Sequence, residues 1–286
     1  MTAQIIDGKA QAARLCGELQ GQIAAFRARS GRPPGLAVVL VGDDEASHIY
    51  VRGKRKRGEE LGFRAFTEDY PASVSEDDLL AVIGRLNADP HVDGILVQLP
   101  LPKHISSERV LAAVDPDKDV DGFNPANMGR LLAGHPRFVP CTAAGIMALI
   151  RSTGISLPGK KAVVVGRSNI VGKPTALLLL HEHATVTLCH SRTENLAAEC
   201  RTADVLVVAV GKKFCILGDF IKPGAVVIDV GINRDESGLC GDVAFAQARE
   251  KAGHITPVPG GVGPMTIAML MANTLRAAAQ REEQRA

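Results

Sequence analysis

Short apolar runs rich in β-branched residues recur along the chain, separated by longer segments with helical periodicity. The most apolar of these runs, such as 162–165 and 205–210, show no alternation with polar residues. A strand of this kind must be covered on both faces, as in a parallel sheet flanked by helices. The pattern therefore predicts an α/β fold built on parallel sheets. The predicted strands are 36–41, 63–67, 94–99, 162–165, 185–188, 205–210 and 226–230.

The length of 286 residues is sufficient for two domains, each with its own core. Residues 115–140 contain several aspartates, glycines and prolines and separate the first three predicted strands from the last four. We therefore place a domain boundary near residue 139. Periodicity alone does not assign the final helix to either domain.

Composition favours small molecules as partners. The formal net charge is only +2, with charges of both signs spread along the chain, so neither a nucleic acid nor a membrane partner is indicated. The six cysteines stand singly, without the spacing of a zinc site or a disulfide framework, which favours a reducing compartment. The first residues lack the pattern of a signal peptide, and no apolar run approaches the length of about 20 residues that spans a bilayer. We expect a cytoplasmic protein.

The segment 161–174 reads as a strand, a turn with Gly166 and Gly172 at its ends, and a helix that begins near Pro174. Glycines allow the backbone to approach a phosphate, and the N-terminus of a helix adds free N–H donors. A Walker loop is excluded, because five residues separate the glycines and Pro174 stands where the magnesium-binding hydroxyl is required. The segment is typical of a pyrophosphate-binding loop rather than of an NTPase.

The end of the next strand distinguishes NADP from NAD. Dinucleotide-binding folds read the ribose there, with an acidic residue for NAD or a cation for NADP. The sequence 189–192 is Cys-His-Ser-Arg and holds no carboxylate, while Ser191 and the loop residue Arg167 offer a hydroxyl and a guanidinium for a 2′-phosphate. The alternative is that Ser191 caps a turn and Arg167 is a solvated charge. The joint placement of the two favours NADP.

Tyr50 and Lys54 are four residues apart in a predicted helix and therefore share one face. A Tyr-x-x-x-Lys pair is also the signature of short-chain dehydrogenases, but there it follows the glycine loop, and here it precedes it. The alternative is that Lys54 lies on an ordinary solvent-exposed helix face, because its neighbours in the sequence include Arg52, Arg55, Lys56 and Arg57.

Two further polar residues stand at informative places. Gln98 lies at the carboxyl end of a predicted strand, where open α/β sheets bind ligands, although an ordinary strand-end residue is an equal alternative. The sequence 117–122, Asp-Lys-Asp-Val-Asp-Gly, imitates the start of a calcium loop, yet Met128 replaces the glutamate required at its twelfth position. We expect no metal. Asp121 is either a turn carboxylate or a partner for N–H donors of a heterocycle.

The run from 257 to 265, Pro-Val-Pro-Gly-Gly-Val-Gly-Pro-Met, predicts an irregular loop, because it combines fixed-φ prolines with permissive glycines. An apolar helical pattern follows from Thr266 to Leu275. The loop either brings backbone close against a flat ligand or forms a tight structural corner.

Six motifs, taken together, closely resemble those of the bifunctional methylenetetrahydrofolate dehydrogenase/methenyltetrahydrofolate cyclohydrolase family. The resemblance runs nearly from end to end, and one departure is Ala143, where the family generally has proline. The motifs are Tyr50-x-x-x-Lys54, Gln98-Leu-Pro-Leu-Pro, Asp117-Lys-Asp-Val-Asp-Gly-Phe, Pro140-Cys-Thr, Val165-Gly-Arg-Ser-x-Ile-Val-Gly and Pro257-Val-Pro-Gly-Gly-Val-Gly-Pro-Met-Thr.

The resemblance implies two domains that flank a cleft. The first, residues 1–139 completed by the C-terminal helix 265–286, would be catalytic and bind folate. The second, residues 140–264, would be Rossmann-like and bind NADP. The resemblance also implies tetrahydrofolate derivatives as partners, a homodimer, and a role in one-carbon metabolism and purine biosynthesis.

The implied reaction is oxidation of 5,10-methylenetetrahydrofolate with NADP⁺, followed by hydrolysis of the methenyl product to 10-formyltetrahydrofolate. Lys54 would transfer protons, with Gln98 tuning it, Tyr50 packing on the folate and Asp121 holding the pterin. The other implied site residues are Pro259, Gly260 and Gly261 for the substrate and Gly166, Arg167, Ser168, Ser191 and Ile232 for the cofactor. The alternatives are a shikimate-type NADP-dependent dehydrogenase and a non-catalytic NADP-binding regulator.

If Lys54 acts as a neutral amine, its pKa must be lowered, and the sizes of the available interactions indicate which of them can do this. Lowering a lysine pKa from about 10.4 to about 7.4 requires roughly 4 kcal/mol of differential destabilisation. A like-charged helical neighbour contributes only about 0.2–0.5 kcal/mol. Desolvation must therefore supply most of the shift in pKa.

Overall fold

The computed structural model describes residues 2–236 and 238–284. The chain divides into two compact units. The three-strand unit comprises residues 14–141 and those from 267 onward, and the six-strand unit comprises residues up to 13 together with 142–266. The helices α1 (Gly8–Ser30) and α10 (Val262–Glu283) each contribute residues to both units. Both units are α/β, as the sequence predicts.

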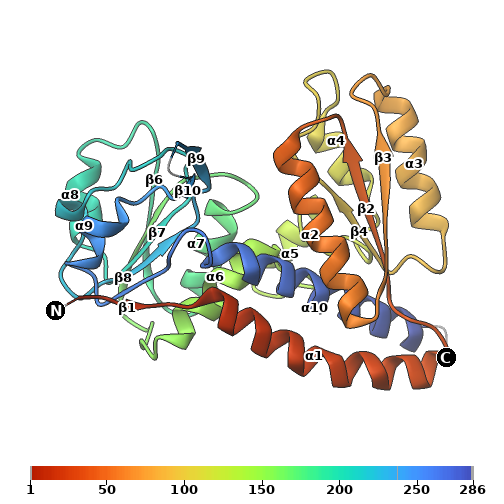
Figure 1. The fold of residues 1–286 in the computed structure, drawn as a ribbon, viewed down its shortest axis with the longest axis horizontal. Helices are drawn as coiled ribbons and strands as arrows, with labels where there is room; N and C mark the ends of the chain where they lie inside the picture. Colours follow the sequence, from red (N-terminus) through yellow and green to blue (C-terminus); the bar gives the residue numbers. More distant parts are fainter. Residues whose placement is uncertain (1, 237, 285–286) are drawn as a thin grey trace. The chain divides into compact units, whose positions relative to one another are not determined.

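The three-strand unit holds a parallel sheet in the order β3-β2-β4. Every residue of the central strand β2 and of β4 is buried, whereas β3 at the edge is half-exposed. Helix α2 packs against β2 and β3 (Figure 1). In chain order, the elements of this unit are β2 (Gly35–Val41), α2 (Glu45–Leu61), β3 (Arg64–Tyr70), α3 (Glu76–Ala88), β4 (Gly94–Val97), α4 (Ser107–Ala113) and α5 (Pro125–Leu132).

The six-strand unit holds a parallel sheet in the order β1-β11-β8-β7-β5-β6 and a separate antiparallel hairpin, β9-β10. The connections through α7 and α8 give the alternation typical of a nucleotide-binding fold. In chain order, its elements are β1 (Gln4–Ile5), α6 (Cys141–Ser152), β5 (Lys161–Val165), α7 (Gly172–His181), β6 (Thr185–Cys189), α8 (Leu196–Arg201), β7 (Val205–Val208), η1 (Gly218–Phe220), β8 (Val226–Asp229), β9 (Asn233–Asp235), β10 (Gly238–Cys240), α9 (Phe245–Arg249) and β11 (His254–Ile255).

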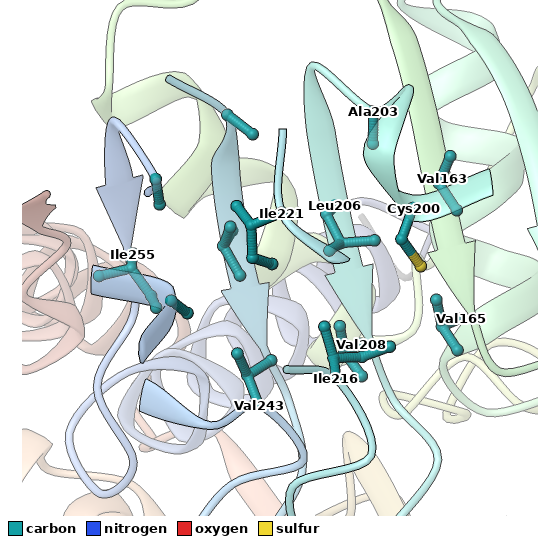
Figure 2. Close-up of a cluster of buried hydrophobic side chains, with 14 of the residues drawn as sticks. Val163, Val165, Cys200, Ala203, Leu206, Val208, Ile216, Ile221, Val243 and Ile255 are labelled. Atoms are coloured by element: carbon teal, nitrogen blue, oxygen red, sulfur yellow. The ribbon is translucent and has the colours of Figure 1, made fainter. Parts of the chain in front are cut away.

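Each unit has a core that sits on its own sheet. In the six-strand unit, alternate residues of β5 and β7 point into one cluster with side chains from the later loops. Figure 2 shows Val163, Val165, Leu206 and Val208 in this cluster, together with Ile255 of β11. In the three-strand unit, side chains of β2 and β4 pack with Leu79, Ile83 and Leu86 of α3. The fully buried strands explain why their sequences lack polar alternation.

Two sequence-based expectations differ from the structure. The sequence places residues 1–13 in the first domain, but β1 pairs in parallel with β11, so they cluster with the six-strand unit. A two-residue strand is too short to give a periodic signal. The run 257–265 is expected to be irregular throughout, but α10 begins at Val262. Pro264 is compatible with this start, because the first turn of a helix does not require its N–H groups.

Candidate active site and cofactor site

Helix α2 places Lys54 on its buried face. The helix begins after Asp44, whose carboxylate accepts a hydrogen bond from the backbone N–H of Ser47 at 2.8 Å, and it ends at Gly62 in the left-handed region. Its buried residues recur at helical spacing and include Val51 and Lys54. Lys54 is only 8% exposed, which is unusual for a lysine.

The neighbouring basic residues behave differently from Lys54. Arg55, Lys56 and Arg57 are exposed and form ion pairs with Glu59 or Glu60 one turn further along α2. They form the solvated helix face that a charge run predicts, and Lys54 turns inward. The alternative interpretation of Lys54 as part of that face is wrong.

The Lys54 amine donates a hydrogen bond from Nζ to Oε1 of Gln98 at 2.9 Å. Gln98 follows β4, and its Nε2 donates to the carbonyl oxygen of Leu99 at 2.7 Å. This second bond fixes the amide so that its oxygen faces the lysine. An amide oxygen orients the amine without the full negative charge that would hold it protonated.

Asp121 lies within a tightly bonded loop and close enough to Lys54 for the two charges to interact. The carboxylate of Asp119 accepts hydrogen bonds from the backbone N–H groups of Phe123 and Asn124 and from the side chain of Asn127. These bonds fix the loop on both sides of Asp121. We call Lys54, Gln98 and Asp121 the Lys54 cluster: the amine of Lys54 is buried, and the amide of Gln98 and the carboxylate of Asp121 are half-buried.

Electrostatics in the Lys54 cluster favour uncharged groups. Burial lowers the pKa of the Lys54 amine, while attraction to Asp121 partly opposes the shift. Burial likewise raises the pKa of Asp121, opposed by the charge of Lys54 and by the neighbouring Cys141 thiol. Burial is thus the main cause in both cases. A lysine held in this way can accept and return a proton closer to neutral pH than a free one.

Tyr50 lies one turn before Lys54 on α2 and is half-buried, and burial raises the pKa of its phenol. The phenol therefore remains protonated at neutral pH, so the ring offers an apolar face and a hydrogen-bond donor. Tyr50 and Lys54 share the helix face expected from their spacing.

Two residues near the Lys54 cluster carry no assigned role in the sequence analysis. Burial raises the pKa of the Cys141 thiol well above its usual range, and the thiol donates to the carbonyl oxygen of Val120 at 3.2 Å. Asn273 of α10 donates to the carbonyl oxygens of Val120 and Val139 at 2.9 and 3.1 Å. A polar residue within the apolar pattern of α10 is the available signal for Asn273. These bonds hold the backbone immediately before Asp121 and two residues before Cys141.

The glycine loop of the six-strand unit is held in a single shape by close packing. Gly166 has φ of 125°, and a Cβ there would lie 2.2 Å from the carbonyl oxygen of Ala209. A Cβ on Gly172 would lie 1.9 Å from the carbonyl oxygen of Gly166. Only glycine fits at both ends of the turn. The backbone N–H of Gly166 donates to the carbonyl oxygen of Cys189 at 2.9 Å, which places the loop beside the end of β6.

The loop and the end of β6 fit a phosphorylated dinucleotide. Arg167, Ser168 and Ser191 are exposed, and the start of α7 has no side-chain cap bond at Val171. The segment 189–192 contains no carboxylate. The Oγ of Ser168 is already engaged within the loop, because it accepts bonds from the N–H groups of Val171 and Gly172 at 3.2 and 3.3 Å. The O–H of Ser168 remains free to donate, and Arg167 and Ser191 offer a guanidinium and a hydroxyl suited to a 2′-phosphate.

The loop before α10 is partly a structural corner. Gly261 is buried, and a Cβ there would lie 2.6 Å from the carbonyl oxygen of Pro257. Pro259 is exposed and Gly260 half-buried, so these two carry the accessible backbone of the loop. Ile232, which follows β8, is 46% exposed, a high value for a large apolar side chain.

Neither a metal site nor a membrane span is found among residues 2–236 and 238–284. No group of three or more His, Cys, Asp or Glu side chains there is arranged to hold a metal ion. No helix within those residues is long and apolar enough to cross a membrane.

A parallel six-strand sheet with a glycine-lined strand–turn–helix, together with a desolvated lysine in a second α/β unit, defines a dinucleotide-dependent enzyme class. Comparison with known protein families identifies which enzymes of this class the chain resembles. Residues 6–121 match the catalytic domain of tetrahydrofolate dehydrogenase/cyclohydrolase, and residues 140–282 match the NAD(P)-binding domain of the same family. The chain belongs to the tetrahydrofolate dehydrogenase/cyclohydrolase family.

Individual relatives agree with this assignment. The chain is 58% identical to the bifunctional protein FolD of Ralstonia nicotianae, covering 99% of this chain and 98% of that protein. It is 60% identical to FolD of Bordetella avium, covering 97% and 98%. Its fold matches the FolD crystal structure from Campylobacter jejuni with a TM-score of 0.95 at 46% identity, covering 98% and 99%.

A relative with a bound cofactor is also similar. The FolD structure from Trypanosoma brucei, described as complexed with NADP cofactor and inhibitor, matches with a TM-score of 0.95 at 42% identity over the full length of both chains. Shikimate 5-dehydrogenase of Thermus thermophilus shares only the fold, at 18% identity and a TM-score of 0.51. The shikimate-type alternative is therefore not supported.

Proposed function

We propose that Lys54 carries the proton transfers of a bifunctional enzyme that oxidises 5,10-methylenetetrahydrofolate with NADP⁺ and hydrolyses the methenyl product to 10-formyltetrahydrofolate. Membership in the family supports both activities. The observation that carries the role of Lys54 is its burial together with its hydrogen bond to an amide oxygen.

The oxidation step needs alignment more than acid or base catalysis. When bound, NADP⁺ supplies the acceptor for the hydride that leaves the one-carbon bridge. The two flanking nitrogens of the folate stabilise the positive charge that remains on the methenyl carbon. The residues Arg167 and Ser191 bind the cofactor phosphate, Gly166 and Ser168 shape its loop, and Ile232 offers an apolar contact.

The hydrolysis step needs proton transfer at two atoms. Neutral Lys54 accepts a proton from water as its oxygen bonds to the methenyl carbon. The Lys54 ammonium then returns that proton to the departing ring nitrogen as the carbon–nitrogen bond breaks, and the proton of the new hydroxyl group passes to solvent. Gln98 holds the amine in position through both transfers. Lys54 is thus a base first and an acid second.

The remaining site residues bind the folate. The Asp121 carboxylate suits the N–H donors of the pterin ring, and Tyr50 suits its flat face. Pro259 and Gly260 offer accessible backbone to the substrate, and the buried Gly261 fixes the shape of that loop. The cleft between the two domains stays a prediction, as do a cytoplasmic homodimer and a role in purine biosynthesis. Analytical ultracentrifugation measures the oligomeric state directly.

Substitution of Lys54 by methionine tests this division of labour. We expect Lys54→Met to reduce methenyl hydrolysis by about 10²–10⁴-fold, the usual contribution of a general acid–base residue, and to change hydride transfer far less. Methenyltetrahydrofolate absorbs in the near ultraviolet, so its appearance and decay report the two activities in one cuvette.

Lys56→Met is the matched control, because Lys56 lies on the same helix with its side chain 79% exposed. It should leave both activities intact. An equal loss of both activities in Lys54→Met would contradict the proposed role. Absence of both activities from the unmodified protein would overturn the proposed function itself.

A further inference from the structure

Two buried aspartates lie in the six-strand unit, separate from the Lys54 cluster. Asp229, the last residue of β8, is 3% exposed, and Asp242, two residues after β10, is fully buried. Buried carboxylates are costly unless they are hydrogen-bonded, so their partners indicate what they do.

Asp242 accepts hydrogen bonds from the backbone of one loop and from a side chain of another. Its Oδ2 accepts hydrogen bonds from the backbone N–H groups of Val210 and Gly211 at 2.8 and 2.9 Å, in the loop after β7. Its Oδ1 accepts from the side-chain Nδ2 of Asn233, at the start of β9, at 3.0 Å. One carboxylate therefore ties the loop after β7 to the segment after β8.

Asp229 holds Asp242 in place. Its Oδ1 accepts from the backbone N–H groups of Gly231 and Asp242 at 3.1 and 2.9 Å, and its Oδ2 accepts from that of Val243 at 3.0 Å. A Cβ on Gly231 would lie 2.1 Å from the Asp242 carboxyl group, and a Cβ on Gly241 would lie 1.8 Å from Oδ2 of Asp229. Both carboxylates fill space that only glycine leaves open.

These bonds act at the edge of the sheet where ligands bind. Strands β7 and β8 are neighbours in the sheet, and β7 also pairs with β5, whose end leads into the glycine loop. All three strands are parallel, so the loops that follow them emerge at one edge, the carboxyl edge. Val210 and Ile232 lie in two of these loops and are 41% and 46% exposed. They are large apolar side chains left accessible on rigidly bonded backbone.

We propose that Asp242, supported by Asp229, is a positioning residue for the cofactor: it fixes the loops that carry Val210 and Ile232 as an apolar platform for the flat nicotinamide ring. This inference rests on the proposed function. The bonds to Val210, Gly211 and Asn233 set the distance between the two loops, and a platform for a flat ring requires that distance to be constant.

Asp242→Asn tests the proposal, because asparagine keeps the shape of the side chain and has only one acceptor oxygen. Its amide NH₂ must face either the N–H groups of Val210 and Gly211 or the Nδ2 of Asn233. We expect the dissociation constant for NADP⁺, measured by calorimetry on the folded protein, to rise about tenfold through misplacement of the loops. Methenyl hydrolysis should stay within about twofold, since neither the Lys54 cluster nor the loop at Pro259 and Gly260 is changed.

A second substitution restores the pattern of donors and acceptors. In the double variant Asp242→Asn with Asn233→Asp, the oxygen of the introduced amide again faces the two backbone N–H groups, and its NH₂ donates to the introduced carboxylate. We expect NADP⁺ affinity to recover in the double variant. If Asp242→Asn fails to fold, Asn233→Ala removes only one bond of the set and should weaken NADP⁺ binding measurably on its own.

Asp204→Asn is the matched control. Asp204 lies immediately before β7, at the opposite edge of the same sheet, where it accepts from the N–H of Lys161 and from Nζ of Lys222. It should lower the melting temperature without changing NADP⁺ affinity. Unchanged affinity in Asp242→Asn, or an equal loss in Asp204→Asn, would overturn the positioning role. Failure of the unmodified protein to bind NADP⁺ would instead overturn the proposed function.

Discussion

The Lys54 cluster and the candidate cofactor site differ in their chemical tasks and in the groups that form them. The Lys54 cluster contains two ionisable side chains, Lys54 and Asp121, and burial shifts the pKa of each in the direction that favours its neutral form. The cofactor site consists of exposed side chains and of backbone shaped by glycines at Gly166 and Gly172. Proton transfer benefits from desolvation, whereas phosphate recognition needs fixed donors that are accessible. In this protein, the residue proposed for proton transfer is recognised by its burial, and the residues proposed for phosphate binding are recognised by their exposure.

Among the substitutions in the cofactor site, the largest effect is expected from a change in the glycine-shaped backbone. Gly172→Ala places a methyl group 1.9 Å from the carbonyl oxygen of Gly166, so the loop must change shape. We expect the dissociation constant for NADP⁺ to rise by about 100-fold, which corresponds to about 2.7 kcal/mol. Calorimetry with the purified variant measures this value.

Gly17→Ala is a suitable control for that substitution. Gly17 lies within α1, and a Cβ there would have no heavy atom within 4 Å. Alanine should stabilise the helix by up to about 1 kcal/mol and leave cofactor binding unchanged. Full NADP⁺ affinity in Gly172→Ala would show that the shape of the loop does not matter for binding.

A smaller effect is expected from the exposed cation of the cofactor site. Arg167→Ala should weaken NADP⁺ about tenfold or more while changing NAD⁺ little, because a charge-assisted hydrogen bond contributes about 1.5–3 kcal/mol. The ratio of the two dissociation constants is the measurement that matters. Arg201→Ala removes an exposed arginine of the same unit, paired with Asp219, and should leave the ratio unchanged. An unchanged ratio in Arg167→Ala would assign the choice of cofactor to other groups.

The regular part of the fold can be predicted well from the sequence, since parallel strands buried on both faces leave a continuous apolar run. All seven predicted strands are present, with ends shifted by a few residues. The short strands β1, β9, β10 and β11 are not predicted, because two or three residues cannot show a period. The start of α10 inside a Pro/Gly-rich run is not predicted either, because proline in a first helical turn looks the same as proline in a loop.

A site residue can be predicted from the sequence only where its type and its position in a predicted helix or strand both indicate a role. Lys54 and Gln98 stand out through their positions on a helix and at a strand end, and the structure joins them by a hydrogen bond. Asp229 and Asp242 carry no signal, because their role depends on backbone N–H groups from several loops that tertiary folding brings together. Lys118 is similar: it is fully buried and donates to the carbonyl oxygens of Leu86 and Asp89, which nothing in the sequence around it indicates.

The pKa of Lys54 tests the central claim most directly. The Lys54 side-chain nitrogen can be followed by NMR as a function of pH, with Lys54→Met used to assign its signal. We expect a pKa below the ordinary lysine range, because burial disfavours the ammonium form, and a further decrease in Asp121→Asn, because that substitution removes the carboxylate that opposes the shift. A Lys54 pKa in the ordinary lysine range, unaffected by Asp121→Asn, would contradict the account of Lys54 as a desolvated proton carrier.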